Sequence, residues 1–102
     1  MLLIFCTAPD LKTARGIAKI LVEGKLAACV SIHKGWESRY RWKGETETSL
    51  ETLILIKAVK KNFRKIEKAI LKNHPYEVPE IMAVPVMAGS KKYLEWVKEV
   101  TC

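Results

Sequence analysis

The sequence predicts an α+β domain whose elements follow the order β-α-β-β-α-β, with a further helix at the C-terminal end. Two uninterrupted apolar runs, at residues 2–7 and 53–57, are typical of central strands that are covered on both sides. Apolar residues recur at helical spacing over residues 11–22 and 59–70, and strict alternation over residues 36–42 indicates a strand. This order is the split βαβ, or ferredoxin-like, arrangement.

The first helix is predicted to follow the first strand directly. Pro9 suits the first turn of a helix, and the Asp10 side chain can cap free backbone amides there. Gly24 is the expected end of this helix. Residues 26–32 read as a second strand with Cys29 in the core, and residues 33–35 allow a bend or a bulge.

The next segment predicts a long hairpin arm over residues 36–50. One face of its first strand carries Trp36, Ser38, Tyr40 and Trp42, and the glycine of "WKGE" suits a tight turn. The arm is longer than a small sheet needs, and an aromatic surface of this size should be buried. We therefore expect the arm to pack onto neighbouring subunits.

The second half of the chain predicts a basic amphipathic helix, an edge strand and a last helix. Pro75 stops the second helix, and residues 80–86 read as the fourth strand. Pro85 cannot donate a hydrogen bond to a neighbouring strand, so this strand should lie at an edge of the sheet. Ser90 is the expected cap of the last helix, with Leu94 and Val97 facing inward.

Length and composition indicate one domain, residues 1–102, in the cytoplasm. No stretch is long enough to span a membrane, and "MLLIFC" is too short for a signal-peptide core. The three cysteines are widely spaced, which suits thiols rather than disulfides. The net charge is +7, but most of the lysines and arginines are interleaved with glutamates along the chain. The central strands also lack the aromatic signature of RNA binders, so we expect no nucleic-acid partner.

Several segments, in this order, resemble the CutA divalent-cation tolerance family. They are "FCTAPD" (residues 5–10), "LAACV" (26–30), "SRYRWKGE" (38–45), "LILIK" (53–57), "HPYEVPEI" (74–81) and "YLEW" (93–96). The resemblance implies a ferredoxin-like subunit in a compact homotrimer, with sheet edges of neighbours paired through the long hairpins. It also implies copper tolerance and copper binding, with no established catalytic reaction.

The family resemblance implies Cys6 and His74 as the metal ligands. Asn73 stands where some members carry a second histidine, so one ligand of those members is missing. Copper(II) takes imidazole readily and copper(I) prefers thiolate, so the pair suits either oxidation state. A third ligand would be Tyr76, Glu77, water or another subunit.

Each of these residues also has a purely structural interpretation. Cys6 is equally consistent with a small buried apolar residue. His74 is equally consistent with a helix-ending residue that holds a carbonyl. A cleft between subunits, lined by Tyr40, Trp42, Tyr76 and Trp96, would suit a small molecule, although such aromatic side chains more often form interface packing.

The alternative function is a trimeric scaffold, similar in shape to PII-type signal proteins. It would bind a small anionic metabolite or a partner protein at clefts between subunits, through Arg39, Arg41 and Glu77. An enzyme is not expected. The chain lacks the glycine-rich phosphate loop of acylphosphatase, which shares this fold, and it shows no Ser-His-Asp set.

Overall fold

The computed structural model describes residues 1–102 and contains the elements in the predicted order. The elements are β1 (Leu2–Ala8), α1 (Leu11–Glu23), β2 (Cys29–Trp42), β3 (Glu45–Ala58), a short 3-10 helix (Lys60–Asn62), α2 (Phe63–Asn73), β4 (Ile81–Pro85) and α3 (Lys91–Val100). None of the three α-helices combines the length and the apolar composition that a membrane crossing requires.

The four strands form one antiparallel sheet in the order β2-β3-β1-β4. The two most apolar strands, β1 and β3, occupy the centre, as the sequence predicts. β4 is an edge strand, and Pro85 pairs with Leu2 at its end. The missing donor of proline is tolerated there because an edge strand has a neighbour on one side only.

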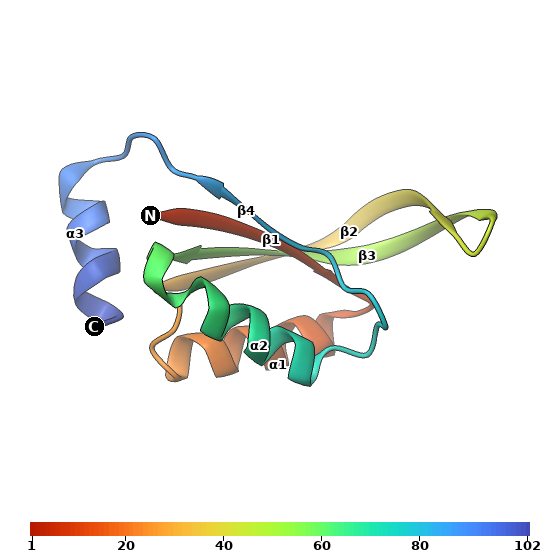
Figure 1. Cartoon of the computed structure of the whole chain (residues 1–102), viewed down its shortest axis with the longest axis horizontal. Coiled ribbons are helices and arrows are strands. Elements are labelled where there is room, and N and C mark those ends of the chain that lie inside the picture. Colours follow the sequence, from red (N-terminus) through yellow and green to blue (C-terminus); the bar gives the residue numbers. More distant parts are fainter.

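Helices α1 and α2 cover one face of the sheet, and the core lies between them and the strands (Figure 1). Asp10 Oδ1 accepts a hydrogen bond of 2.8 Å from the Thr13 amide and so begins α1. The fully buried core residues include Ile4 and Cys6 of β1, Ile54 and Ile56 of β3, Leu21 of α1, and Ile66 and Ile70 of α2.

The paired strands β2 and β3 extend beyond the helices as an arm, which stretches the molecule to 45 Å along its longest axis (Figure 1). The pairing continues to Trp42 and Glu45. Lys43 and Gly44 connect the strands with φ angles of 51° and 82°. Two positive φ values are the signature of a type I′ turn, which matches the twist of a hairpin.

A bulge at Gly35 decides which way the aromatic face of the arm points. His33 pairs with Leu53, but Trp36 pairs with Glu51, so β2 carries one extra residue. Ile54 and Ile56 face the helices, and alternation directs Leu53 and Glu51 to the opposite face. The bulge thus puts Trp36, Tyr40 and Trp42 on the face that no helix of this chain covers.

Two predictions about the second strand were wrong. The strand begins at Cys29, because the Leu26 and Ala27 amides instead donate to Leu21 O and close the end of α1. Cys29 is half-buried rather than part of the core. It pairs with Lys57 on the open face of the sheet, and Lys57 Nζ lies 3.9 Å from its sulfur.

Helix α3 packs at the end of the sheet opposite the arm (Figure 1). Ser90 caps it by accepting a 3.3 Å hydrogen bond from the Tyr93 amide, as predicted. Val97 is fully buried and Leu94 is half-buried, which confirms their inward orientation.

Candidate functional site

Cys6 lies in the central strand β1 and is inaccessible to solvent. Its thiol makes one weak polar contact, 3.7 Å from its sulfur to the Thr7 carbonyl oxygen. Burial raises the pKa of Cys6 from 9.0 to about 12, and the negative charges of Glu80 and Glu51 act in the same direction. At neutral pH the residue is therefore a protonated thiol.

His74 ends α2 and also holds a backbone carbonyl of β1. Its backbone is extended, with φ −106° and ψ 135°, as expected for a residue before proline. Nε2 lies 2.7 Å from Thr7 O, and the Tyr76 amide donates to Nδ1 at 3.1 Å. Since Nδ1 accepts, Nε2 carries the proton and donates to the carbonyl. The helix-ending role predicted for His74 is confirmed.

The structure brings Cys6 and His74 to the same place. Pairing between β1 and β4 ends at Cys6 and Ile81, and the next carbonyl of β1, Thr7 O, receives the His74 imidazole instead. The Cys6 sulfur contacts the same oxygen. Two residues that are 68 positions apart in the sequence are thus neighbours at the end of β1.

This pair has the right donor chemistry for copper but is not a complete metal site. Both ring nitrogens of His74 already have hydrogen-bond partners, and Cys6 is protonated. No group of three or more histidine, cysteine, aspartate and glutamate side chains has a geometry that suits a metal ion. Asn73 does not replace the missing histidine, because its Nδ2 donates to Ala69 O at 2.8 Å.

A hydrogen-bonded pair, Tyr76 and Glu51, lies beside this site on the open face of the sheet. The Tyr76 hydroxyl donates to Glu51 Oε2 at 2.9 Å, and Glu51 is only 8% exposed. Burial and this bond to Glu51 raise the pKa of Tyr76. Burial, with a contribution from the charge of Glu51, also raises the pKa of Glu80.

Sequence reasoning did not find Glu51. The only indication in the sequence was the position of Glu51 in the alternating pattern of β3, which places it on the same face as Leu53. Its partner Tyr76 is 25 residues away in the sequence, and no local pattern joins the two.

An open pocket of about 850 Å³ lies between the base of the arm and the segment that joins α2 to β4. Four predicted cleft residues line it, namely Tyr40, Trp42, Tyr76 and Glu77. Trp96 does not, because it lies on α3, where its ring is 5.7 Å from the ring of Tyr93. The charged residues that line the pocket are Glu47, Glu51, Glu77, Glu80, Arg39 and Arg41. Within one chain the pocket is therefore more acidic than basic.

Comparison with known sequences gives a match over nearly the whole chain. Residues 2–100 match the family described as "CutA1 divalent ion tolerance protein". The "Divalent-cation tolerance protein CutA" of Thermus thermophilus is 45% identical over 98 residues, which are 96% of this chain and 95% of that protein. "Protein CutA, chloroplastic" of Arabidopsis thaliana is 38% identical over 98% of this chain but only 55% of its own length.

Solved structures agree with this match. The Thermus thermophilus structure, "Divalent cation tolerance protein (Cut A1)", superimposes with a TM-score of 0.96 at 44% identity, and the match covers 100% of both chains. The "Periplasmic divalent cation tolerance protein CutA" of Archaeoglobus fulgidus superimposes with a TM-score of 0.95 at 36% identity, over 99% of both chains. The long hairpin and the C-terminal helix lie within the matched region.

Proposed function

This chain belongs to the CutA1 divalent ion tolerance protein family, and from that premise we propose that it is a homotrimeric, copper-binding protein of metal tolerance that catalyses no reaction. One observation carries the proposal. The Cys6 thiol and the His74 imidazole contact the same carbonyl oxygen, Thr7 O, at the end of the central strand. Thiolate and imidazole together accommodate both common oxidation states of copper.

The hydrogen bonds at the site specify what copper binding must change. Cys6 has to lose its proton, and its raised pKa opposes this at neutral pH. His74 has to give up one of its two ring hydrogen bonds, either to Thr7 O or from the Tyr76 amide. Copper binding should therefore release a proton and become stronger as the pH rises.

The ligand set needs at least one donor beyond this pair. Tyr76 and Glu77 lie two and three residues after His74, and both line the pocket at the base of the arm. The Tyr76 hydroxyl is engaged with Glu51, so Glu77, water or a second subunit is the simpler source of a third donor. Two protein donors alone would give only weak and unselective binding.

The proposal of a homotrimer rests on uncovered apolar surface. Trp36, Tyr40 and Trp42 are each about two-fifths exposed, on a face with no helix. Met82 and Val84 on the edge strand β4 are 53% and 44% exposed. An apolar face that adjoins an open sheet edge is suited to pairing with further copies of the chain.

The alternative of a PII-like scaffold has weaker support in this chain. The pocket at the base of the arm has a suitable volume for a small ligand. However, its four glutamates outnumber its two arginines, which disfavours an anionic metabolite. An anion would have to bind where a neighbouring subunit brings more positive charge.

We also propose the cytoplasm as the location. The names of two relatives place them elsewhere, one as chloroplastic and one as periplasmic, so location varies among similar proteins. Fractionation of the source cells, with immunodetection of the chain, would test this part of the proposal.

Native mass spectrometry tests assembly and metal binding in one experiment. We expect a trimer of the wild type that takes up one copper per chain, and a trimer of the Cys6→Ser/His74→Ala variant that takes up none. The chain offers a matched control, Cys29→Ser/His33→Ala, which removes the same two residue types elsewhere. A monomer at micromolar concentration would exclude the assembly, and full copper uptake by the first variant would exclude the site.

A further inference from the structure

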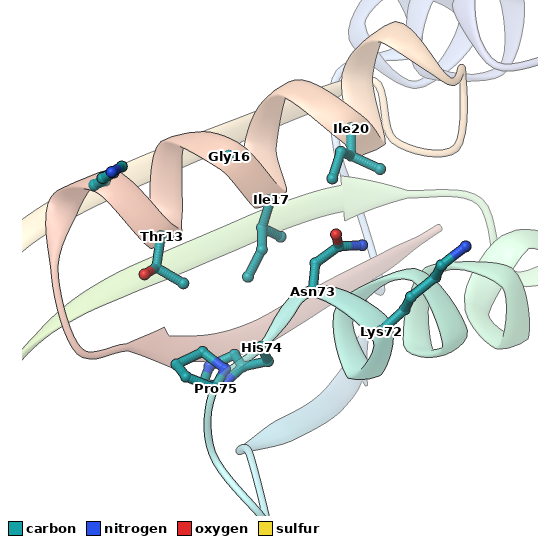
Figure 2. A pocket seen from close by; sticks show the side chains of 9 residues that line it. Thr13, Gly16, Ile17, Ile20, Lys72, Asn73, His74 and Pro75 are labelled. Carbon is teal, nitrogen blue, oxygen red and sulfur yellow. The ribbon is translucent and has the colours of Figure 1, made fainter.

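A second pocket, of about 600 Å³, lies on the helix side of the molecule. Figure 2 shows that it is a groove between α1 and the C-terminal end of α2. Thr13, Ile17 and Ile20 point from α1 toward α2, and Asn73 points from the other wall toward α1 (Figure 2). The complete lining is Lys12, Thr13, Gly16, Ile17, Ile20, Lys72, Asn73, His74 and Pro75.

Gly16 keeps the α1 wall of the groove open. It lies in the middle of α1, where glycine is less favourable than alanine because it loses more backbone freedom on folding. A Cβ built on Gly16 would meet no atom within 4 Å, so packing does not require a glycine there. Its φ is also not positive, so the backbone does not require one. Because Gly16 has no side chain, the space above it remains open as part of the groove.

The groove combines an apolar wall with positive charge. Ile17 is buried beneath it, and Ile20 is 41% exposed beside it. Lys12 and Lys72 line it, and no acidic side chain does, in contrast to the pocket at the base of the arm. Neither lysine takes part in an ion pair within the chain.

One polar atom in the groove remains available to a ligand. Asn73 uses its Nδ2 on Ala69 O, and its side-chain oxygen makes no hydrogen bond within the chain. His74 contributes only its ring surface, because both its nitrogens are bonded to backbone groups.

From these observations we propose that the groove between α1 and α2 binds a small organic anion with an apolar body, such as an aromatic phosphate or carboxylate. The apolar part would lie over Gly16 and against Ile20, and the anionic group would lie at the rim of the groove, attracted by Lys12 or Lys72. The volume is in the range of known small-molecule sites. Eight of the nine lining residues are not part of the proposed copper site, so this binding does not depend on copper.

A titration followed by amide chemical shifts in the ¹⁵N-labelled, metal-free chain would test the proposal. Phenyl phosphate is the probe, benzylammonium carries the opposite charge on a similar ring, and inorganic phosphate lacks the ring. We expect saturable shifts at Gly16, Ile20 and Asn73 with phenyl phosphate only. Equal binding of benzylammonium or of inorganic phosphate, or no saturable shift with any probe, would overturn the proposed ligand class.

Two pairs of variants separate the groove from general surface effects. Gly16→Leu should fill the groove and weaken phenyl phosphate binding at least about tenfold, whereas Gly16→Ala, which gives α1 a similar gain in helix propensity, should retain most of it. Lys12→Glu/Lys72→Glu should weaken binding by a similar factor, and Lys92→Glu/Lys98→Glu on α3, with the same net charge, should not. Undiminished binding by both groove variants would refute the site, even if copper binding proved correct.

Discussion

Replacing Tyr76 by phenylalanine should destabilise the folded chain by about 1–3 kcal/mol. The substitution removes only the hydroxyl, which donates to Glu51 Oε2 at 2.9 Å. Glu51 is 8% exposed and accepts no other side-chain hydrogen bond. The cost is therefore that of leaving a buried, charged acceptor without its donor, which exceeds the net worth of an ordinary hydrogen bond.

Urea unfolding at pH 7, followed by tryptophan fluorescence at fixed protein concentration, would measure this loss. Tyr93→Phe is the matched control, since the Tyr93 hydroxyl makes no hydrogen bond in the chain and its loss should change stability by less than about 0.5 kcal/mol. Glu51→Gln/Tyr76→Phe completes a double-mutant cycle, and we expect a coupling of about 1 kcal/mol or more. Equal stability of Tyr76→Phe and wild type would refute our account of this pair.

Three further predictions concern other parts of the molecule. Gly44→Ala should lower the free energy of unfolding in urea by about 1–2 kcal/mol, because the φ of Gly44 is 82°. Lys43→Asn should leave the free energy of unfolding unchanged or raise it, because asparagine suits this position of a type I′ turn. The reverse order of stability would contradict the assigned turn. Cys6 has a pKa of about 12 in the folded chain against 9.0 for a free thiol, so its contribution to stability is complete below pH 9 and falls between pH 9 and pH 12 by about 1.4 kcal/mol per pH unit. Cys6→Ala should therefore lose stability less steeply than the wild type between pH 9 and pH 12. Parallel plots of unfolding free energy against pH for the two proteins would contradict the burial effect. Burial raises the pKa of Glu80, so the carboxylate form of this side chain destabilises the folded chain relative to its protonated form. Glu80→Gln should therefore raise the melting temperature slightly at pH 7, and this gain should vanish as acid protonates the wild-type residue. A gain that grew toward low pH would contradict this sign.

The order of the elements was predictable because each has a strong local signal. The apolar runs of β1 and β3 identified the central strands, and Pro85 identified the edge strand. Asp10 and Ser90 marked two helix starts through caps that the structure confirms. Each of these features depends only on residues that are close together in the sequence, so it can be predicted without the structure.

The contacts of the candidate site were not predictable in the same way. The bond from His74 to Thr7 O joins residues 67 positions apart, and the bond from Tyr76 to Glu51 spans 25. Both depend on where the segment after α2 passes the end of β1, which follows from the packing of the whole domain. Family resemblance named Cys6 and His74, and only the structure places them on the same carbonyl.

The groove at Gly16 was missed for a similar reason. A single glycine in a helical pattern carries little information, and its role depends on the C-terminal end of α2 lying alongside. The burial of Cys29 was predicted wrongly because an apolar run does not specify which face of an edge strand is covered. Register settles that point, and Cys29 pairs with Lys57 on the open face.

Calorimetric titration of the reduced protein with copper, at pH 7 and at pH 8, tests the central claim most directly. We predict one copper per wild-type chain, tighter binding at pH 8 with the release of about one proton, and no binding to Cys6→Ser/His74→Ala. The Cys29→Ser/His33→Ala variant should behave like wild type. Equal binding by wild type and Cys6→Ser/His74→Ala would contradict the claim that the thiol and imidazole at Thr7 O form the copper site.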